Sequence, residues 1–245
     1  LVIREDYLSQ QPETTGTESV TDASDPAINY DGTALACLGD TGRSLYFFSG
    51  GKGQYLVKNK KMTAPSFDSF GWLWVAESDG AVRAYNAAST NEKERSKGIE
   101  IPVSWRSGMT FSSLRISHDG ARVVVVGTRD GTAAVVMSGV VRDSSGTPKG
   151  FTEPVRVTSS ITPRTAVWAG EQNLVVVNDK TGESEVTTLS GEETKFDRLD
   201  GVKSVSAAGN TSNMLAHRSD GSCYVLEERG WNRLNTSTRE MSFAG

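Results

Sequence analysis

The stretch Leu114-Arg115-Ile116-Ser117-His118-Asp119-Gly120-Ala121-Arg122-Val123-Val124-Val125 places a short polar turn between two apolar runs. Both runs are rich in aliphatic and β-branched side chains, which favour β-strands. The glycine supplies the positive φ that such a turn needs. Asp130-Gly131 marks a second turn, and an Asp-Gly pair between apolar runs is a strong hairpin signal. The stretch therefore predicts three consecutive antiparallel strands.

The same order of elements occurs five times along the chain, at intervals of roughly 40 to 50 residues, the usual length of a β-propeller blade. The first turn of each unit contains Gly32, Gly71, Gly120, Gly170 or Gly209. The inner strands are expected at 27–30, 65–70, 112–117, 164–168 and 202–207. The fourth strands are expected at 54–58, 99–104, 152–157, 195–199 and 230–234.

We therefore predict an all-β fold, a β-propeller of five four-stranded blades over residues 25–235. Residues 1–24 are expected to form an N-terminal arm or linker, and residues 236–245 a C-terminal tail. Two polar insertions, 86–98 and 142–150, are expected to be surface loops. A β-sandwich also has many short strands, but it does not predict the same two turns at the same offsets in five units.

Charge and hydropathy exclude two classes of function. The chain has 245 residues, and 26 Lys plus Arg against 30 Asp plus Glu give a formal net charge of −4, so it is not a nucleic-acid binder driven by bulk charge. Uninterrupted apolar runs, such as Trp72 to Ala76 and Val123 to Val126, are far shorter than the roughly 18 residues of a membrane helix. No nucleic-acid partner and no transmembrane segment are therefore expected.

Two stretches carry a family resemblance, Met62-Thr63-Ala64-Pro65-Ser66-Phe67-Asp68-Ser69-Phe70-Gly71-Trp72-Leu73-Trp74-Val75 and the stretch 114–125 quoted above, with Gly139-Val140-Val141-Arg142-Asp143 in support. They resemble the C-terminal propeller of the LpqB family of actinobacterial lipoproteins, over roughly residues 25–245. One departure is His118, where such turns more often carry Pro. The family's lipid-anchored cysteine and its domain of the sporulation-germination type are not in this sequence, so we expect an excised C-terminal domain.

The resemblance implies a function outside the cytoplasm. The family is associated with the sensor histidine kinase of the Mtr two-component system and with cell-envelope homeostasis. It therefore implies a non-catalytic, extracytoplasmic protein-binding module whose partner is the extracytoplasmic domain of a sensor kinase. It also implies that the full-length protein is lipid-anchored, and that this chain reaches the membrane only through an anchor it does not contain.

The search for catalytic chemistry yields few candidates. Five-bladed propellers also host glycosidases, which need paired carboxylates in the channel, and Asp25, Asp68 and Asp200 lie on or near inner strands. Ser117-His118-Asp119 are contiguous in one turn and cannot form a catalytic triad. We predict no catalytic residue, no cofactor and no metal site. The alternative function is a glycan-binding propeller or degenerate glycosidase.

That alternative would use Asp68, Arg115 and Trp168 at the mouth of the channel. Trp168, like Trp72 and Trp74, also fits a place in the gaps between blades. Cys37 and Cys223 are expected on neighbouring blades of a closed ring, either as a disulfide or as two buried thiols.

The candidate partner-binding residues gather on the segment that leads into the third inner strand, and on two inner strands. Trp, Arg, Met and Phe are enriched in the cores of protein interfaces, although packing against the adjacent blade is an equal alternative for the aromatic residues. An arginine near the channel anchors a partner's carboxylate, lines the channel in an ion pair or is simply solvated. The residues are Trp105, Arg106, Met109, Phe111, Arg115 and Arg164.

Overall fold

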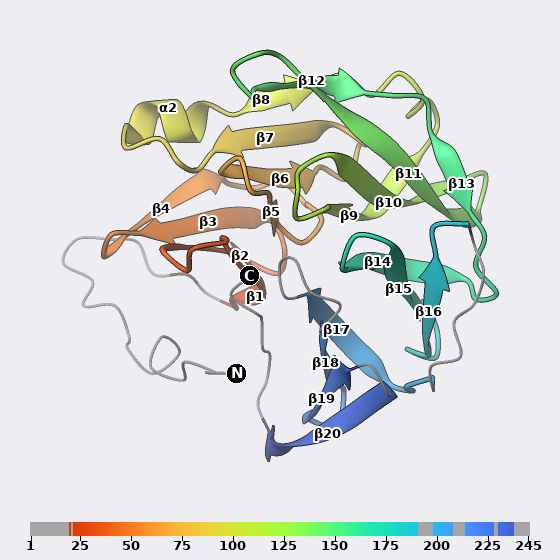
Figure 1. The fold of residues 1–245 in the computed structure, drawn as a ribbon. Helices are drawn as coiled ribbons and strands as arrows, with labels where there is room; N and C mark the ends of the chain where they lie inside the picture. Colours follow the sequence, from red (N-terminus) through yellow and green to blue (C-terminus); the bar gives the residue numbers. More distant parts are fainter. Residues whose placement is uncertain (1–19, 21, 191–197, 208–213, 228–229, 238–245) are drawn as a thin grey trace.

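The computed structural model describes residues 20, 22–190, 198–207, 214–227 and 230–237. Five antiparallel sheets stand around a common axis as the blades of a β-propeller (Figure 1), which confirms the predicted fold class. The predicted arm at 1–24 lies almost entirely outside the described residues. The described propeller begins with β1 at Ser24 and ends with β20 at Ser237.

Each blade is built from strands that follow one another in the sequence. Blade 1 contains β1 (Ser24–Ile28), β2 (Ala34–Gly39), β3 (Ser44–Ser49) and β4 (Lys52–Val57). Blade 2 contains β5 (Ser66–Phe67), β6 (Trp72–Ala76), β7 (Val82–Asn86) and β8 (Ile99–Ile101). Blade 3 contains β9 (Thr110–Ile116), β10 (Arg122–Arg129), β11 (Thr132–Arg142), β12 (Pro148–Phe151) and β13 (Val155–Val157).

The last two blades complete the ring. Blade 4 contains β14 (Pro163–Ala169), β15 (Asn173–Asn178) and β16 (Ser184–Thr188). Most of the fourth strand predicted at 195–199 lies outside the described residues of this blade. Blade 5 contains β17 (Val202–Ala207), β18 (Met214–Arg218), β19 (Ser222–Glu227) and β20 (Gly230–Ser237).

The repeated turns form for the reason that the sequence suggests. Gly120 has a φ of 68°, in the left-handed region that glycine adopts without strain. Asp119 stabilises the same turn, since its Oδ1 accepts hydrogen bonds from the Ser117 hydroxyl and the Ala121 amide. These bonds lower the pKa of Asp119, against the opposing effect of its partial burial. The turn thus sets the register between β9 and β10.

Apolar side chains fill the seams between successive blades. Four clusters of buried residues span blades 1–2, 2–3, 3–4 and 4–5, around Phe47, Trp74, Trp168 and Met214 respectively. Trp74 and Trp168 therefore lie between blades, as predicted. Such interdigitated side chains hold the sheets at their packing distance and fix the shape of the channel.

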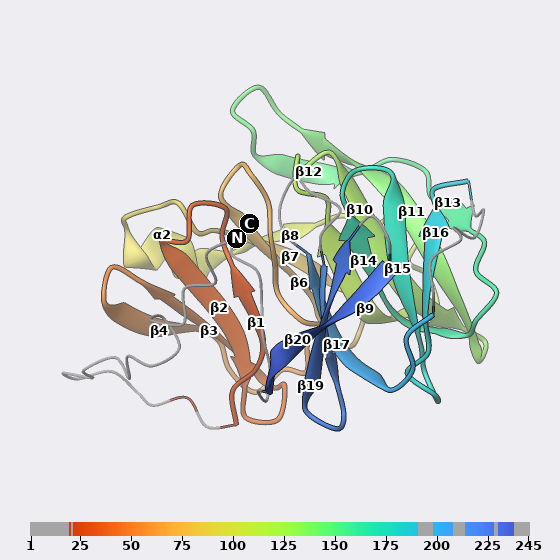
Figure 2. The same cartoon turned by 60° about the horizontal axis from the view of Figure 1, so that its bottom comes forward.

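The surface loop predicted at 142–150 is shorter in the structure, where it spans residues 143–147 between β11 and β12. β11 extends to Arg142 and pairs with β12, so the insertion is the tip of a hairpin that stands out from the ring in Figure 2. β13 pairs with the first part of β11, so the outer strand predicted at 152–157 is present but shorter, at Val155–Val157, and β12 precedes it as an additional strand. The polar residues of the insertion do not all face solvent, because Arg142 is buried against Asp68 of blade 2.

The predicted loop at 86–98 also contains regular structure, a short helix α2 (Glu92–Lys97). The side chain of Asn91 accepts a hydrogen bond from the Lys93 amide and caps the helix. No residue of this helix is buried, so the expected surface position is correct.

Candidate functional site

The five inner strands enclose a channel along the axis of the ring. Residues at their carboxyl ends, with Tyr30 and His118 beyond, line a cavity of about 120 Å³, here called the carboxyl-end pocket. Residues at or just before their amino ends line a second cavity of about 200 Å³, the amino-end pocket. Arg115 and Val205 line both, so Arg115 lies near the middle of the channel.

Asp68 is one of the three acids predicted on or near inner strands, and its side chain is fully buried. Its Oδ1 accepts hydrogen bonds from the amides of Phe70 and Trp72, at 2.9 and 3.0 Å. Its Oδ2 accepts from Trp74 Nε1 at 2.7 Å and from Arg142 Nη2 at 2.6 Å. Four donors occupy this carboxylate, which leaves it unsuited to acid or base catalysis.

Trp168 is likewise unavailable as a platform for a sugar ring. The residue is 4% exposed and belongs to the core between blades 3 and 4. Its Nε1 donates to the backbone carbonyl of Arg115 at 3.1 Å. Because sugar sites stack their ligand on exposed aromatic faces, the glycan alternative loses its main residue.

The amino-end pocket contains two of the predicted partner-binding residues, Arg115 and Arg164. Arg115 Nη1 donates to the Pro65 carbonyl of blade 2 at 2.7 Å. Arg164 Nη2 donates to the carbonyls of Val202 and Lys203 in blade 5, at 3.0 and 3.1 Å. Each arginine thus reaches from its own inner strand to the neighbouring blade.

Burial lowers the pKa of Arg115, and the negative charge of Asp25 partly opposes this. Asp25 lines the same pocket. An arginine remains protonated in proteins, so the channel holds a positive charge largely removed from water.

The segment from Trp105 to Phe111 leads into the amino end of β9, on the face that carries the amino-end pocket. Phe111 is 7% exposed, and Trp105 and Met109 are partly buried against the apolar cluster between blades 2 and 3. The Trp105 ring contacts Phe111 and Phe151, with centroids 6.0 and 6.3 Å apart. Trp105, Met109 and Phe111 therefore pack against blades 2 and 3. Arg106, in the same segment, is partly exposed.

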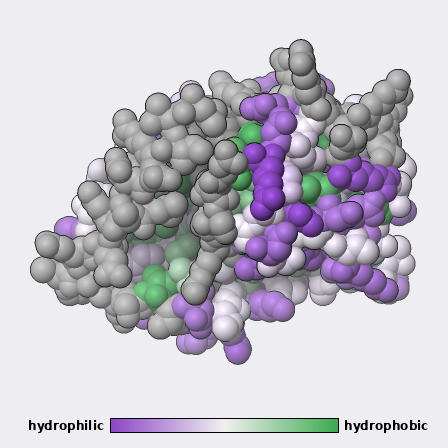
Figure 3. Space-filling model, turned by 90° about the horizontal axis from the view of Figure 1, so that it is seen from below, coloured by the Kyte–Doolittle hydropathy of each residue, from purple (hydrophilic) through white to green (hydrophobic). Residues whose placement is uncertain are grey.

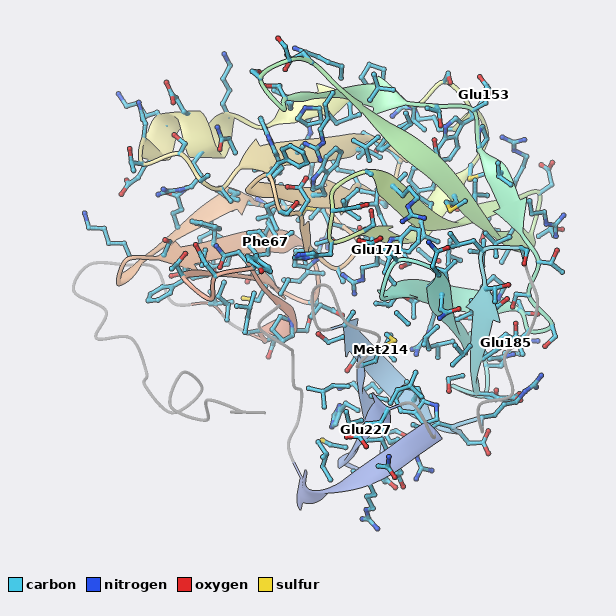
Figure 4. All side chains as sticks on the ribbon, viewed as in Figure 1. Phe67, Glu153, Glu171, Glu185, Met214 and Glu227 are labelled. Carbon is cyan, nitrogen blue, oxygen red and sulfur yellow. The ribbon has the colours of Figure 1, made fainter. Side chains whose placement is uncertain are left out.

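The other two predicted acids, Asp25 and Asp200, do not join Asp68 in a catalytic pair. Asp25 lines the amino-end pocket, and Asp68 lies at the opposite end of the channel. Asp200 lines neither pocket, and its backbone carbonyl accepts from Arg218. In Figure 4 the labelled Phe67 lies near the axis, whereas Glu153, Glu185 and Glu227 lie at the periphery. Within the described ranges, no three His, Cys, Asp or Glu side chains gather as metal ligands.

Both cysteines are buried thiols, so the disulfide considered for Cys37 and Cys223 is not formed. Among the described residues no helix is long and apolar enough to cross a membrane. On the side seen in Figure 3, hydrophilic side chains cover most of the described surface, with small hydrophobic spots between them.

Sequence reasoning missed three residues at the channel. Tyr30 and His118 have ring centroids 4.8 Å apart at the carboxyl-end pocket, and Lys203 lines the amino-end pocket. Tyr30 and His118 occupy turns, where the alternation of a strand does not indicate whether a side chain points toward the channel. Lys203 lies on an inner strand, and the alternation along β17 could have placed it on one face with Val205.

Solved structures of similar shape support the fold. The chain is similar to hydrazine synthase of Kuenenia stuttgartiensis, with a TM-score of 0.56, 15% identity and coverage of 90% of this chain and 69% of that one. It is also similar to the calcium-binding protein regucalcin of Agrobacterium tumefaciens, with a TM-score of 0.56, 12% identity and coverage of 89% and 74%. The protein is thus a β-propeller domain.

The sequence comparisons then define the family. The model of the lipoprotein LpqB β-propeller domain matches residues 6–241, and the chain belongs to that family. It is 26% identical over 171 residues to lipoprotein LpqB of Streptomyces avermitilis, and 27% identical over 177 residues to that of Streptomyces coelicolor. Each alignment covers 64% of this chain and 27% of the relative, so the chain matches about a quarter of the length of these lipoproteins.

Proposed function

We propose that this domain is a non-catalytic protein-binding module of an extracytoplasmic, lipid-anchored lipoprotein, and that it binds the extracytoplasmic domain of a two-component sensor histidine kinase of the Mtr type. Membership of the LpqB propeller family is the observation that carries the proposal. The lipoprotein names of the Streptomyces relatives support the location outside the cytoplasm.

The chemistry of the channel supports a binding role over a catalytic one. Four donors occupy Asp68, and Trp168 is buried between blades. Two of the three residues of the glycan alternative thus serve the fold, and a site with acid and base functions would need different groups.

The proposed contact surface is the face around the amino-end pocket. It carries all six candidate residues: Trp105, Arg106, Met109, Phe111, Arg115 and Arg164. Their packing divides them into two groups. The apolar members support the surface from within, whereas Arg106 is accessible and Arg115 and Arg164 line the cavity. Binding would alter kinase output only if the propeller bound its two signalling states with unequal affinity.

The test compares two charge reversals on opposite faces. Arg106→Glu changes the proposed contact face, and Lys52→Glu changes the far face, since Lys52 pairs with Ser49 beside the carboxyl end of β1. Both side chains lie outside the core, so both variants should fold. We expect Arg106→Glu to weaken binding of the purified kinase ectodomain at least about tenfold, and Lys52→Glu to leave it within about twofold. Equal affinities would remove this face from the proposal.

A further inference from the structure

The amino-end pocket carries a surplus of positive charge. Among the described residues, three cationic side chains line it, from Arg115, Arg164 and Lys203, against one carboxylate, that of Asp25. The whole chain has a net charge of −4, so this surplus is local and opposite in sign to that of the molecule. A concave site with walls of low dielectric constant concentrates such a field, which attracts anions.

In each arginine, one terminal nitrogen of the guanidinium donates to backbone carbonyls, and the other terminal nitrogen is available to a ligand. Arg115 Nη1 is held by Pro65 O, and Arg164 Nη2 by the carbonyls of Val202 and Lys203. For the part of the chain that is described, Arg115 Nη2 and Arg164 Nη1 have no hydrogen-bond partner. The two forks are therefore oriented before a ligand arrives, which reduces the entropy lost on binding.

The remaining polar wall of the pocket consists of hydroxyl groups. Ser113 and Thr165 share a hydrogen bond at 2.9 Å between blades 3 and 4, and Ser112 donates to the Arg164 carbonyl at 2.8 Å. Both bonds join the strands that carry Arg115 and Arg164. The distance between the two arginines is thus set by direct contacts between their blades.

The volume limits the size of the ligand. The cavity of about 200 Å³ is smaller than the roughly 300–1,000 Å³ typical of sites for drug-sized ligands. It has room for a short carboxylate and not for a sugar chain. A planar guanidinium matches a carboxylate in geometry as well as in charge.

We infer that the amino-end pocket is a carboxylate-binding site, in which Arg115 and Arg164 hold the ligand through their uncommitted amino groups. The carboxylate could belong to a small free acid or to an acidic side chain of a docked protein. The site itself does not depend on the proposed kinase partner. Only the second source rests on the proposed function, and separate arms of the experiment distinguish the two.

The experiment titrates the chain with succinate and, separately, with a Gly-Glu-Gly peptide blocked at both ends. Binding is followed by amide NMR shifts at constant ionic strength, with sodium chloride as the reference and blocked Gly-Gln-Gly as the uncharged control. We expect saturable shifts at residues 112–115, 164–165 and 203–205. Saturation by succinate alone would assign a free acid, and saturation by the glutamate peptide would assign a protein side chain.

Two variants test the role of the cations. Arg164→Lys keeps the positive charge and removes the planar guanidinium. Lys203→Gln changes an exposed side chain, so it remains informative if Arg164→Lys does not fold. Lys52→Gln makes the same charge change at the other end of the ring. We expect affinity to fall at least about tenfold in the pocket variants and to stay within about twofold in the control. Shifts equal to those with chloride, or equal affinity in all variants, would overturn the inference.

Discussion

Arg142 donates from Nη2 to Oδ2 of Asp68 at 2.6 Å, although the two residues lie 74 positions apart in the sequence. The pair joins the hairpin tip of blade 3 to the inner turn of blade 2. Its side chains are 10% and 0% exposed. The guanidinium also lies over the ring of Phe70, 4.3 Å from its centroid, and donates to the Gly120 and Gly146 carbonyls.

Removal of Arg142 would leave the Asp68 carboxylate buried without its cation. Breaking such a buried pair from one side costs about 3–5 kcal/mol. We expect Arg142→Ala to lower the free energy of unfolding by about 3 kcal/mol, measured by urea denaturation. Lys149→Ala in the same hairpin removes an exposed pair with Asp143 and should cost less than about 1 kcal/mol. An equal decrease in the free energy of unfolding of the two variants would contradict the conclusion that the buried Arg142–Asp68 ion pair stabilises the fold.

Trp168 should contribute to stability and not to ligand binding. Trp168→Ala would open a cavity between blades 3 and 4, at an expected cost of about 3–5 kcal/mol by the same measurement. Tyr30, which is 59% exposed at the carboxyl-end pocket, serves as the control. Tyr30→Ala should change stability by less than about 1 kcal/mol. A fully stable Trp168→Ala protein would show that the indole is exposed in solution.

Tyr85 should make the protein less stable at high pH. Burial raises the pKa of its phenol to about 12, from an ordinary value of 10.0. Below pH 10 the phenol is protonated in both the folded and the unfolded chain, so burial of Tyr85 does not reduce the free energy of unfolding there. Between pH 10 and about 12 the unfolded chain ionises first, and stability falls by roughly 2–3 kcal/mol.

The test for Tyr85 compares the wild type with Tyr85→Phe. The difference between their free energies of unfolding should change over pH 10 to 12, and absorbance at 295 nm should show one fewer late-titrating tyrosine in the variant. Parallel stability curves would mean that Tyr85 reaches water in the folded protein.

Asp143 should titrate as an unusually strong acid at the hairpin tip. The hydroxyl of Ser145, with smaller contributions from Lys149 and the amides of Thr147 and Ser145, lowers its pKa to about 2. We expect Ser145→Ala to raise this pKa measurably towards 3.8, as followed by carboxyl NMR shifts. An unchanged pKa would show that the turn hydrogen bonds are not maintained in solution.

The architecture could be predicted because it rests on local signals. The Asp-Gly turn at Asp130-Gly131 and the apolar runs beside it are sufficient to predict a hairpin, and five repeats are sufficient to predict a ring. The extension of blade 3 could not be predicted in this way. Arg142 belongs to a polar insertion, and its burial depends on an acid 74 positions away.

The candidate site was predicted only in part, for a related reason. A strand pattern places Arg115 and Arg164 near the channel, and the pocket confirms that both line it. It cannot show which amino groups are held by neighbouring blades, because those contacts join strands far apart in the sequence. For Trp105 and Phe111, composition suited both an interface and a core, and packing places them mainly in the core between blades 2 and 3.

The most direct test of the central claim is a calorimetric titration of this chain with the purified extracytoplasmic domain of the cognate sensor kinase. Soluble cell-wall glycans serve as a second titrant. We expect saturable heat with the kinase domain and none with the glycans. Heat with the glycans alone, or none with either, would contradict the claim that this propeller is the kinase-binding module.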